Sequence, residues 1–214
     1  YWQAFNDTQR QPVLMDQVVA QGYEVAAFSS VGFGGPAEID HTVFAAVSPD
    51  HMYPAPHDGD RNVDITRAWH RWFDVRNAPD TPFFSLLYYD PGNAASDMGT
   101  SAAAPSTLAE RYAAYMHGIK ATDHEVEDVL AALDAKEGQR ETLVIIASDH
   151  GYEFDELGLG NIGHGSNYGP WQLRSTLLMR WPGRKPHVYT HRSAHQDLPG
   201  TLLQDVFGCR NPIS

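Results

Sequence analysis

The feature of this sequence that most constrains its fold is the alternation of short apolar runs with amphipathic stretches. The apolar runs are typical of buried strands and cover residues 23–29, 83–89, 143–147 and 175–181. The amphipathic stretches have apolar side chains at helical spacing and cover residues 12–21, 65–73, 106–136 and 193–207. This order predicts an α/β fold whose mostly parallel sheet is flanked by helices on both faces. The length of 214 residues and the 42% hydrophobic content predict a single domain over residues 1–214.

Charge and composition exclude several classes of function. The formal net charge of -12 argues against broad binding to nucleic acid or to anionic membrane, because such binding uses clustered Lys and Arg. An anionic substrate must therefore be held locally. The single cysteine, Cys209, excludes an internal disulfide and a thiolate-rich zinc site. The sequence contains no apolar run of the roughly 18 residues that a membrane helix requires.

The sequence TLVIIASDHG carries an apolar strand directly into Asp149 and His150. In a parallel α/β sheet, ligands bind at the carboxyl ends of the strands, and carboxylate and imidazole groups are common ligands of divalent metals. A second imidazole follows at Gly163-His164-Gly165, where glycines allow the backbone to approach a ligand closely. These residues predict a metal-dependent site for phosphate or sulfate esters, with Asp149 and His150 as metal ligands. Two protein ligands rarely hold a catalytic metal, so further ligands must come from elsewhere.

Other polar residues follow predicted strands in the same way. Ser29, Ser30 and Asp90 lie at or just after strand ends and are candidates for the same site. Residues 94–105 have mostly small side chains and predict a flexible loop over this site. The segment 48–59 predicts irregular surface.

Several further features have simple structural interpretations. The aromatic stripe that contains Trp69 and Trp72 indicates core packing. Ser193 and Gln196 match a capping box for the last helix, and Asp197 beside His195 is interpreted as a capping or dipole residue. Polar surface or loops are the interpretation for the remaining charged groups: Asp123 with His124; Glu153, Asp155 and Glu156; and the basic run Arg184, Lys185, His187, His191 and Arg192.

The chain resembles the alkaline phosphatase and sulfatase superfamily. Within it, the resemblance is to the periplasmic domain of the YejM-like (PbgA-like) inner-membrane proteins of Gram-negative bacteria. The segments that carry the resemblance are YWQAF from Tyr1, GYEVAAFSS from Gly22, FFSLLYYDP from Phe83, RYAAYMHGIKATDHEVEDVL from Arg111, IIASDHGYEF from Ile145, GHGSNYGPWQ from Gly163 and FGCRNP from Phe207.

The resemblance implies a sulfatase-like fold whose N-terminal part lies outside this sequence. Asp149 and His150 match metal ligands of the superfamily, with Zn, Mn or Mg as the expected metal, and His164 matches a position that faces the substrate. The nucleophile, a further acidic ligand and the membrane anchor are expected upstream of Tyr1, so catalysis is not expected from this chain alone. Related transferases have His-Gly-Pro where this sequence has Tyr89-Asp90-Pro91. This departure weakens an assignment to phosphoethanolamine transfer.

Two functions remain open at this point. The resemblance implies a periplasmic, metal-binding domain of an inner-membrane protein that acts in lipopolysaccharide and outer-membrane lipid homeostasis. Its partners would be lipid or lipopolysaccharide at the inner membrane and a regulatory membrane protein, with no nucleic acid. The alternative is a metal-dependent phosphatase, sulfatase or phosphotransferase that acts on phosphate or sulfate esters.

Overall fold

The computed structural model describes residues 11–34, 38–56, 58–76, 81–91, 107–136 and 142–210. The loop expected at 94–105 lies outside these residues, as do the segment YWQAF and the last residues of FGCRNP. The elements are, in chain order, α2 (Val13–Ala20), β1 (Glu24–Ser29), the 3₁₀ helix η1 (Pro49–His51), β2 (Met52–Pro54), α3 (Arg61–Val75), β3 (Phe83–Tyr88), α4 (Leu108–Lys136), β4 (Val144–Ala147), β5 (Glu153–Phe154), β6 (Ile162–Gly163), α5 (Pro170–Leu173), β7 (Leu177–Arg180) and α6 (Asp197–Asp205). The predicted α/β class, with a parallel sheet and flanking helices, is confirmed.

Strand β1 is the centre of a three-stranded parallel sheet in the order β2-β1-β3. Ala27 of β1 lies opposite Met52 on one side and Leu86 on the other. The expectation of irregular surface over 48–59 was wrong at β2, which pairs with β1 through three residues. A strand this short that ends in Pro54 carries little strand signal, and proline is tolerated there because β2 lies at the edge of the sheet.

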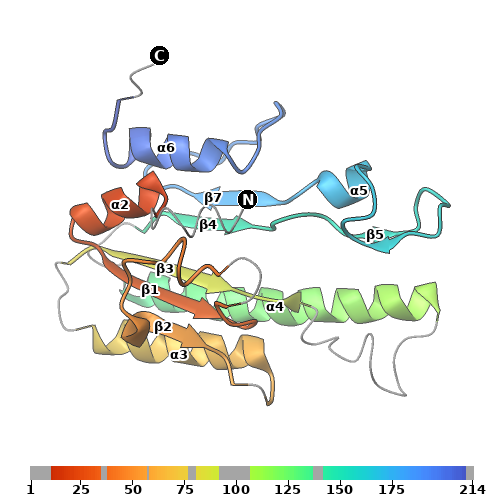
Figure 1. The fold of residues 1–214 in the computed structure, drawn as a ribbon, viewed down its shortest axis with the longest axis horizontal. Coiled ribbons are helices and arrows are strands. Elements are labelled where there is room, and N and C mark those ends of the chain that lie inside the picture. The colour runs from red at the N-terminus through yellow and green to blue at the C-terminus, as the bar shows by residue number, and fades with distance from the viewer. Residues whose placement is uncertain are drawn as a thin grey trace.

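Helices cover both faces of β1 because its successive side chains point to opposite sides. Val25 and Ala27 pack with Met15 and Val18 of α2, whereas Ala26 and Phe28 pack with the aromatic side chains of α3. Figure 1 shows α2 and α3 on opposite sides of β1. Helix α6 contacts α2, and α4 contacts α3. All residues of β1 from Val25 to Ser29 are therefore buried.

Helix α3 begins where Asp60 caps it, because the Asp60 carboxylate accepts hydrogen bonds from the backbone N–H groups of Asn62 and Val63. Its aromatic stripe is buried, which confirms the core assignment of Trp69 and Trp72. The buried Asn62 side chain donates to the Asp90 carbonyl at 2.9 Å and accepts from the Asp90 N–H at 3.1 Å. Helix α3 thus fixes the backbone just beyond the end of β3.

Strands β4 and β7 pair antiparallel and lie beside β3 (Figure 1). Val144 at the start of β4 packs on the same apolar cluster as Phe83 and Leu87 of β3. This packing brings the carboxyl end of β4, and with it Asp149, to the edge of the molecule where β1 and β3 also end.

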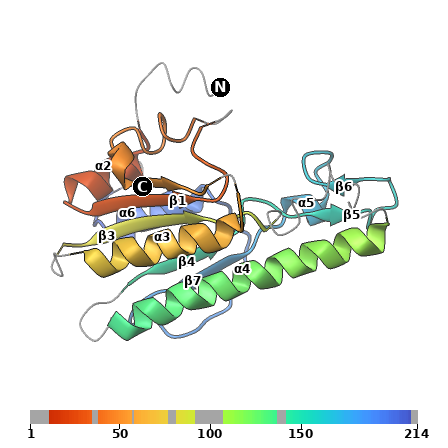
Figure 2. The ribbon, with the colours of Figure 1, turned by 90° about the horizontal axis from the view of Figure 1, so that it is seen from below.

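A small lobe extends beyond this edge. Strands β5 and β6 form an antiparallel pair, and the N-terminal half of α4 runs beneath it (Figure 2). Tyr112 and Tyr115 of α4 contact the Phe154 ring, with ring centroids 5.2 and 5.3 Å apart. The long helix predicted from the sequence therefore supports both the main sheet and the lobe that contains His164.

The final helix begins later than its sequence pattern predicted. The predicted capping box of Ser193 and Gln196 was wrong, because α6 begins at Asp197 and has no side-chain cap. Instead, the Asp197 carboxylate accepts a hydrogen bond of 2.7 Å from the Ala194 N–H. Within the described part of the chain, the structure contains no helix with the length and apolar character of a membrane span.

Candidate metal and ester site

The turn after β4 arranges Asp149 and His150 as a pair. The Asp149 Oδ1 atom accepts a hydrogen bond of 2.9 Å from the His150 N–H, and Asp149 Oδ2 lies 3.5 Å from His150 Nε2. The Asp149 and His150 side chains are 62% and 40% exposed, so a ligand can reach both. The neighbouring Ser148 continues the pairing with β7, because its hydroxyl oxygen accepts from the Thr176 N–H at 2.8 Å.

The geometry of this pair fits a shared divalent metal. Two donors that each bind zinc at about 2.1 Å in tetrahedral geometry lie about 3.4 Å apart, and the observed separation is 3.5 Å. The other ring nitrogen, His150 Nδ1, lies 2.9 Å from the Gly151 carbonyl oxygen. When Nδ1 donates to this carbonyl, Nε2 is left as the free metal-binding nitrogen. The pair can therefore supply one edge of a metal's coordination shell.

His164 lies against this pair although it is distant in sequence. It follows β6 directly, and both flanking glycines have positive φ, at 110° for Gly163 and 78° for Gly165. This backbone carries the ring to His150, so that the two imidazole centroids are 4.0 Å apart and their planes meet at 30°. The structure thus brings together all three residues that the sequence singled out for the site.

Tyr88 is a neighbour of the site that the sequence analysis did not identify. Burial raises the pKa of the Tyr88 hydroxyl above its ordinary value, and the carboxylates of Asp149 and Asp90 raise that pKa further. The end of β3 therefore lies within electrostatic reach of Asp149. Tyr88 could have been predicted from its position at the end of an apolar run, because the same position made Asp90 a candidate.

His195 is a second neighbour that sequence reasoning assigned elsewhere. Its Nε2 atom lies within hydrogen-bond distance, 2.8 Å, of the carbonyl oxygen of Ser148, the residue before Asp149. The segment before α6 is therefore linked to the turn that carries the metal-binding pair. No local pattern reveals this contact, because 47 positions separate the two residues.

The two strand-end serines are buried and form hydrogen bonds to the backbone. Ser29 and Ser30 are each 1% exposed. The Ser29 hydroxyl donates to the Gly32 carbonyl at 2.8 Å, and the Ser30 hydroxyl donates to the Tyr88 carbonyl at 3.1 Å. The Ser29 hydroxyl thus stabilises the turn after β1, and the Ser30 hydroxyl joins the end of β1 to the end of β3.

The described residues provide an incomplete metal shell. Within the described ranges, no cluster of three or more His, Cys, Asp or Glu side chains has the arrangement of a metal site. The Asp149 and His150 pair therefore stays a predicted ligand pair, and His164 a predicted substrate contact.

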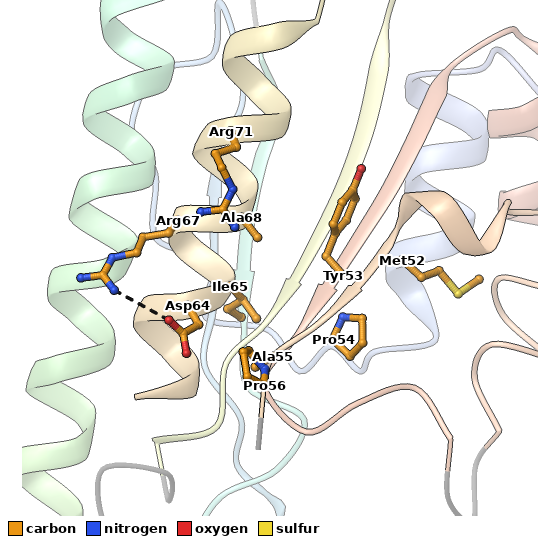
Figure 3. A pocket seen from close by; sticks show the side chains of 10 residues that line it. All are labelled: Met52, Tyr53, Pro54, Ala55, Pro56, Asp64, Ile65, Arg67, Ala68 and Arg71. Atoms are coloured by element: carbon orange, nitrogen blue, oxygen red, sulfur yellow. Dashed lines mark ion pairs between the residues drawn. The ribbon is translucent and has the colours of Figure 1, made fainter. Parts of the chain in front are cut away.

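A cavity of about 320 Å³ lies elsewhere, between β2 and α3 (Figure 3). Its lining includes Tyr53 and Arg71, together with an ion pair between Asp64 and Arg67 at 3.7 Å. None of Asp149, His150 and His164 lines this cavity. It is therefore separate from the candidate site.

Comparisons with known proteins give a family match and a similar curated protein. Residues 3–208 match the family described as Sulfatase. Steryl-sulfatase of Rattus norvegicus is 32% identical to this chain over 119 residues. That match covers 51% of this chain and 20% of the steryl-sulfatase, so the chain spans about a fifth of that relative's length. Domains of the matched family are generally metal-dependent.

Proposed function

This chain belongs to the sulfatase family, and from that premise we propose that it is a periplasmic, metal-binding domain of a YejM-like (PbgA-like) inner-membrane protein. Its role in the full protein is in lipopolysaccharide and outer-membrane lipid homeostasis. It senses lipid or lipopolysaccharide at the inner membrane and acts through a regulatory membrane-protein partner. The resemblance of segments from Tyr1 to Phe207 supports this assignment.

The observation that carries the metal-binding part is the 3.5 Å separation between Asp149 Oδ2 and His150 Nε2, in a turn open to solvent. These two residues would hold a divalent ion such as Zn²⁺, Mn²⁺ or Mg²⁺. When bound, the ion would neutralise charge on a phosphoryl or sulfuryl oxygen. His164, whose ring lies against His150, would contact a further oxygen of the same group, and the closeness of the two rings supports this role.

The second candidate is a metal-dependent hydrolase or transferase of phosphate or sulfate esters. The arrangement of His164 beside the metal-binding pair favours it, because a scaffold without chemistry has no physical need for these three side chains at the end of a strand. The two candidates share the metal and differ in whether the site turns over an ester.

Complementation of cells depleted of the full-length protein separates them. If the protein is a regulator without turnover, Asp149→Ala and His164→Ala restore the lipopolysaccharide content per cell as fully as the wild type does. If it is a hydrolase, the purified full-length wild type cleaves nitrophenyl phosphate or nitrophenyl sulfate, and neither variant does. His187→Ala is the matched control, because His187 is an exposed histidine whose ring contacts Tyr189, which is not one of the proposed site residues. An unchanged lipopolysaccharide content on depletion would contradict the regulatory role.

A further inference from the structure

Gln172 connects the two loops that carry the site histidines. It lies in the short helix α5 and is 3% exposed. Its backbone carbonyl accepts a hydrogen bond of 2.9 Å from the N–H of Gly151, the residue after His150. Its side-chain Oε1 accepts from the Ser166 N–H at 3.1 Å, and its Nε2 donates to the Ser166 hydroxyl oxygen at 2.7 Å. One residue therefore binds the backbone next to His150 and the loop that follows His164.

Glu153 determines which way the Gln172 amide points. The Glu153 side chain is fully buried, and its Oε2 accepts hydrogen bonds from Gln172 Nε2 at 2.6 Å and from Asn167 Nδ2 at 2.7 Å. A carboxylate only accepts, so the amide nitrogen of Gln172 must face it and the amide oxygen must face the Ser166 N–H. The interpretation of Glu153 as part of a solvated loop was wrong.

This buried carboxylate is costly for the fold. Among the residues that the structure describes, its Oε1 atom has no hydrogen-bond partner. Burying a carboxylate with an unsatisfied oxygen destabilises a protein, because the desolvation of that oxygen is not offset. In the β5–β6 pair, Glu153 also lies opposite Gly163, and Gly163 directly precedes His164 in the chain. The unfavourable group is thus located beside the candidate site.

We propose that Gln172, oriented by Glu153, is the positioning residue that holds the His150 and His164 rings against each other. The inference rests on the proposed function for the use of these rings in binding a metal and an ester oxygen. Gln172 touches neither ion nor substrate and acts through the backbone on either side of the histidines. Gln172 belongs to neither of the apolar clusters around β1, so its substitution removes no contact within them.

The test uses three variants of the full-length protein: Gln172→Ala, Gln172→Glu, and a double variant, called the exchange, that combines Glu153→Gln with Gln172→Glu. The exchange keeps an amide facing a carboxylate, whereas Gln172→Glu alone places two carboxylates together. Gln204→Ala is the matched control, because Gln204 is an exposed glutamine in α6. Two quantities are measured: the nuclear Overhauser effect between the His150 and His164 rings in metal-free protein, and the dissociation constant for Zn²⁺.

Both single variants are expected to show no Overhauser effect between the two rings. They are also expected to bind Zn²⁺ about 10- to 100-fold more weakly, as is typical when a group that orients metal ligands is removed. The exchange and Gln204→Ala are expected to keep both properties of the wild type.

An Overhauser effect of wild-type intensity in Gln172→Ala would overturn the inference. If Gln172→Ala does not fold, the exchange variant is the test. The inference is overturned if the exchange variant, like Gln172→Glu, shows no Overhauser effect between the His150 and His164 rings. Separated rings in Gln172→Ala, together with a wild type that binds no Zn²⁺, would support positioning by Gln172 and reject the metal-binding function.

Discussion

Gly151→Ala is expected to weaken Zn²⁺ binding at least tenfold and to lower the melting temperature. A Cβ atom at position 151 would overlap the Trp171 carbonyl oxygen and lie 2.7 Å from the Arg174 carbonyl oxygen. Both atoms belong to the backbone in and just after α5, which cannot move away without breaking the hydrogen bond between the Gly151 N–H and Gln172. Overpacking of this kind typically costs about 1–3 kcal/mol. Because Gly151 adjoins His150, a shift of the backbone at position 151 would move the metal-binding pair directly.

Gly200→Ala is the control for this prediction. No atom lies within 4 Å of a Cβ built at Gly200, and the residue lies inside α6. Alanine inside a helix is about 0.5–1 kcal/mol more favourable than glycine, so this variant should be neutral or slightly more stable. Calorimetry of unfolding and of Zn²⁺ titration measures both effects. A Gly151→Ala protein with wild-type affinity and melting temperature would show that α5 does not constrain the site.

Trp69→Ala is expected to lower the free energy of unfolding by about 3–5 kcal/mol, a large part of the roughly 5–15 kcal/mol available to a typical domain. The Trp69 ring is fully buried and stacks on Phe73 with centroids 4.6 Å apart. Its indole N–H donates to the Ser85 hydroxyl oxygen at 3.2 Å, which joins α3 to β3. Truncation would leave a cavity between the sheet and the helix.

Urea unfolding followed by circular dichroism measures this loss without relying on tryptophan emission. Trp171→Ala is the matched control, because the Trp171 side chain is 48% exposed and lies outside both core clusters. It should cost much less than Trp69→Ala. Equal losses in the two variants would mean that the cluster around α3 is not the stabilising core.

The main elements could be predicted from the sequence because buried strands require apolar runs. Strands β1, β3 and β4 each occupy such a run. Strand β2 was missed, since a three-residue edge strand needs no apolar pattern. Glu153 was misinterpreted for a different reason. A carboxylate signals solvent exposure unless donors surround it, and its two donors, Asn167 and Gln172, lie 14 and 19 positions away.

Some residues of the candidate site could also be predicted from the sequence, and others could not. Asp149 and His150 are adjacent in sequence at the end of a strand, so their proximity needed no knowledge of the fold. The approach of His164 depends on the β5–β6 pair and on two glycines with positive φ. Tyr88 and His195 reach the site only through the packing of β3 and of the segment before α6. Such contacts between distant segments leave no local pattern in a single sequence.

Metal binding by Asp149 and His150 is tested most directly by the divalent metal content of the full-length protein and of its Asp149→Ala and His150→Ala variants, purified identically. We expect stoichiometric Zn²⁺ or Mn²⁺ in the wild type and its loss in both variants, with circular dichroism spectra unchanged because both side chains are partly exposed. Metal absent from the wild type, or retained at wild-type stoichiometry in Asp149→Ala, would show that this pair does not bind a metal.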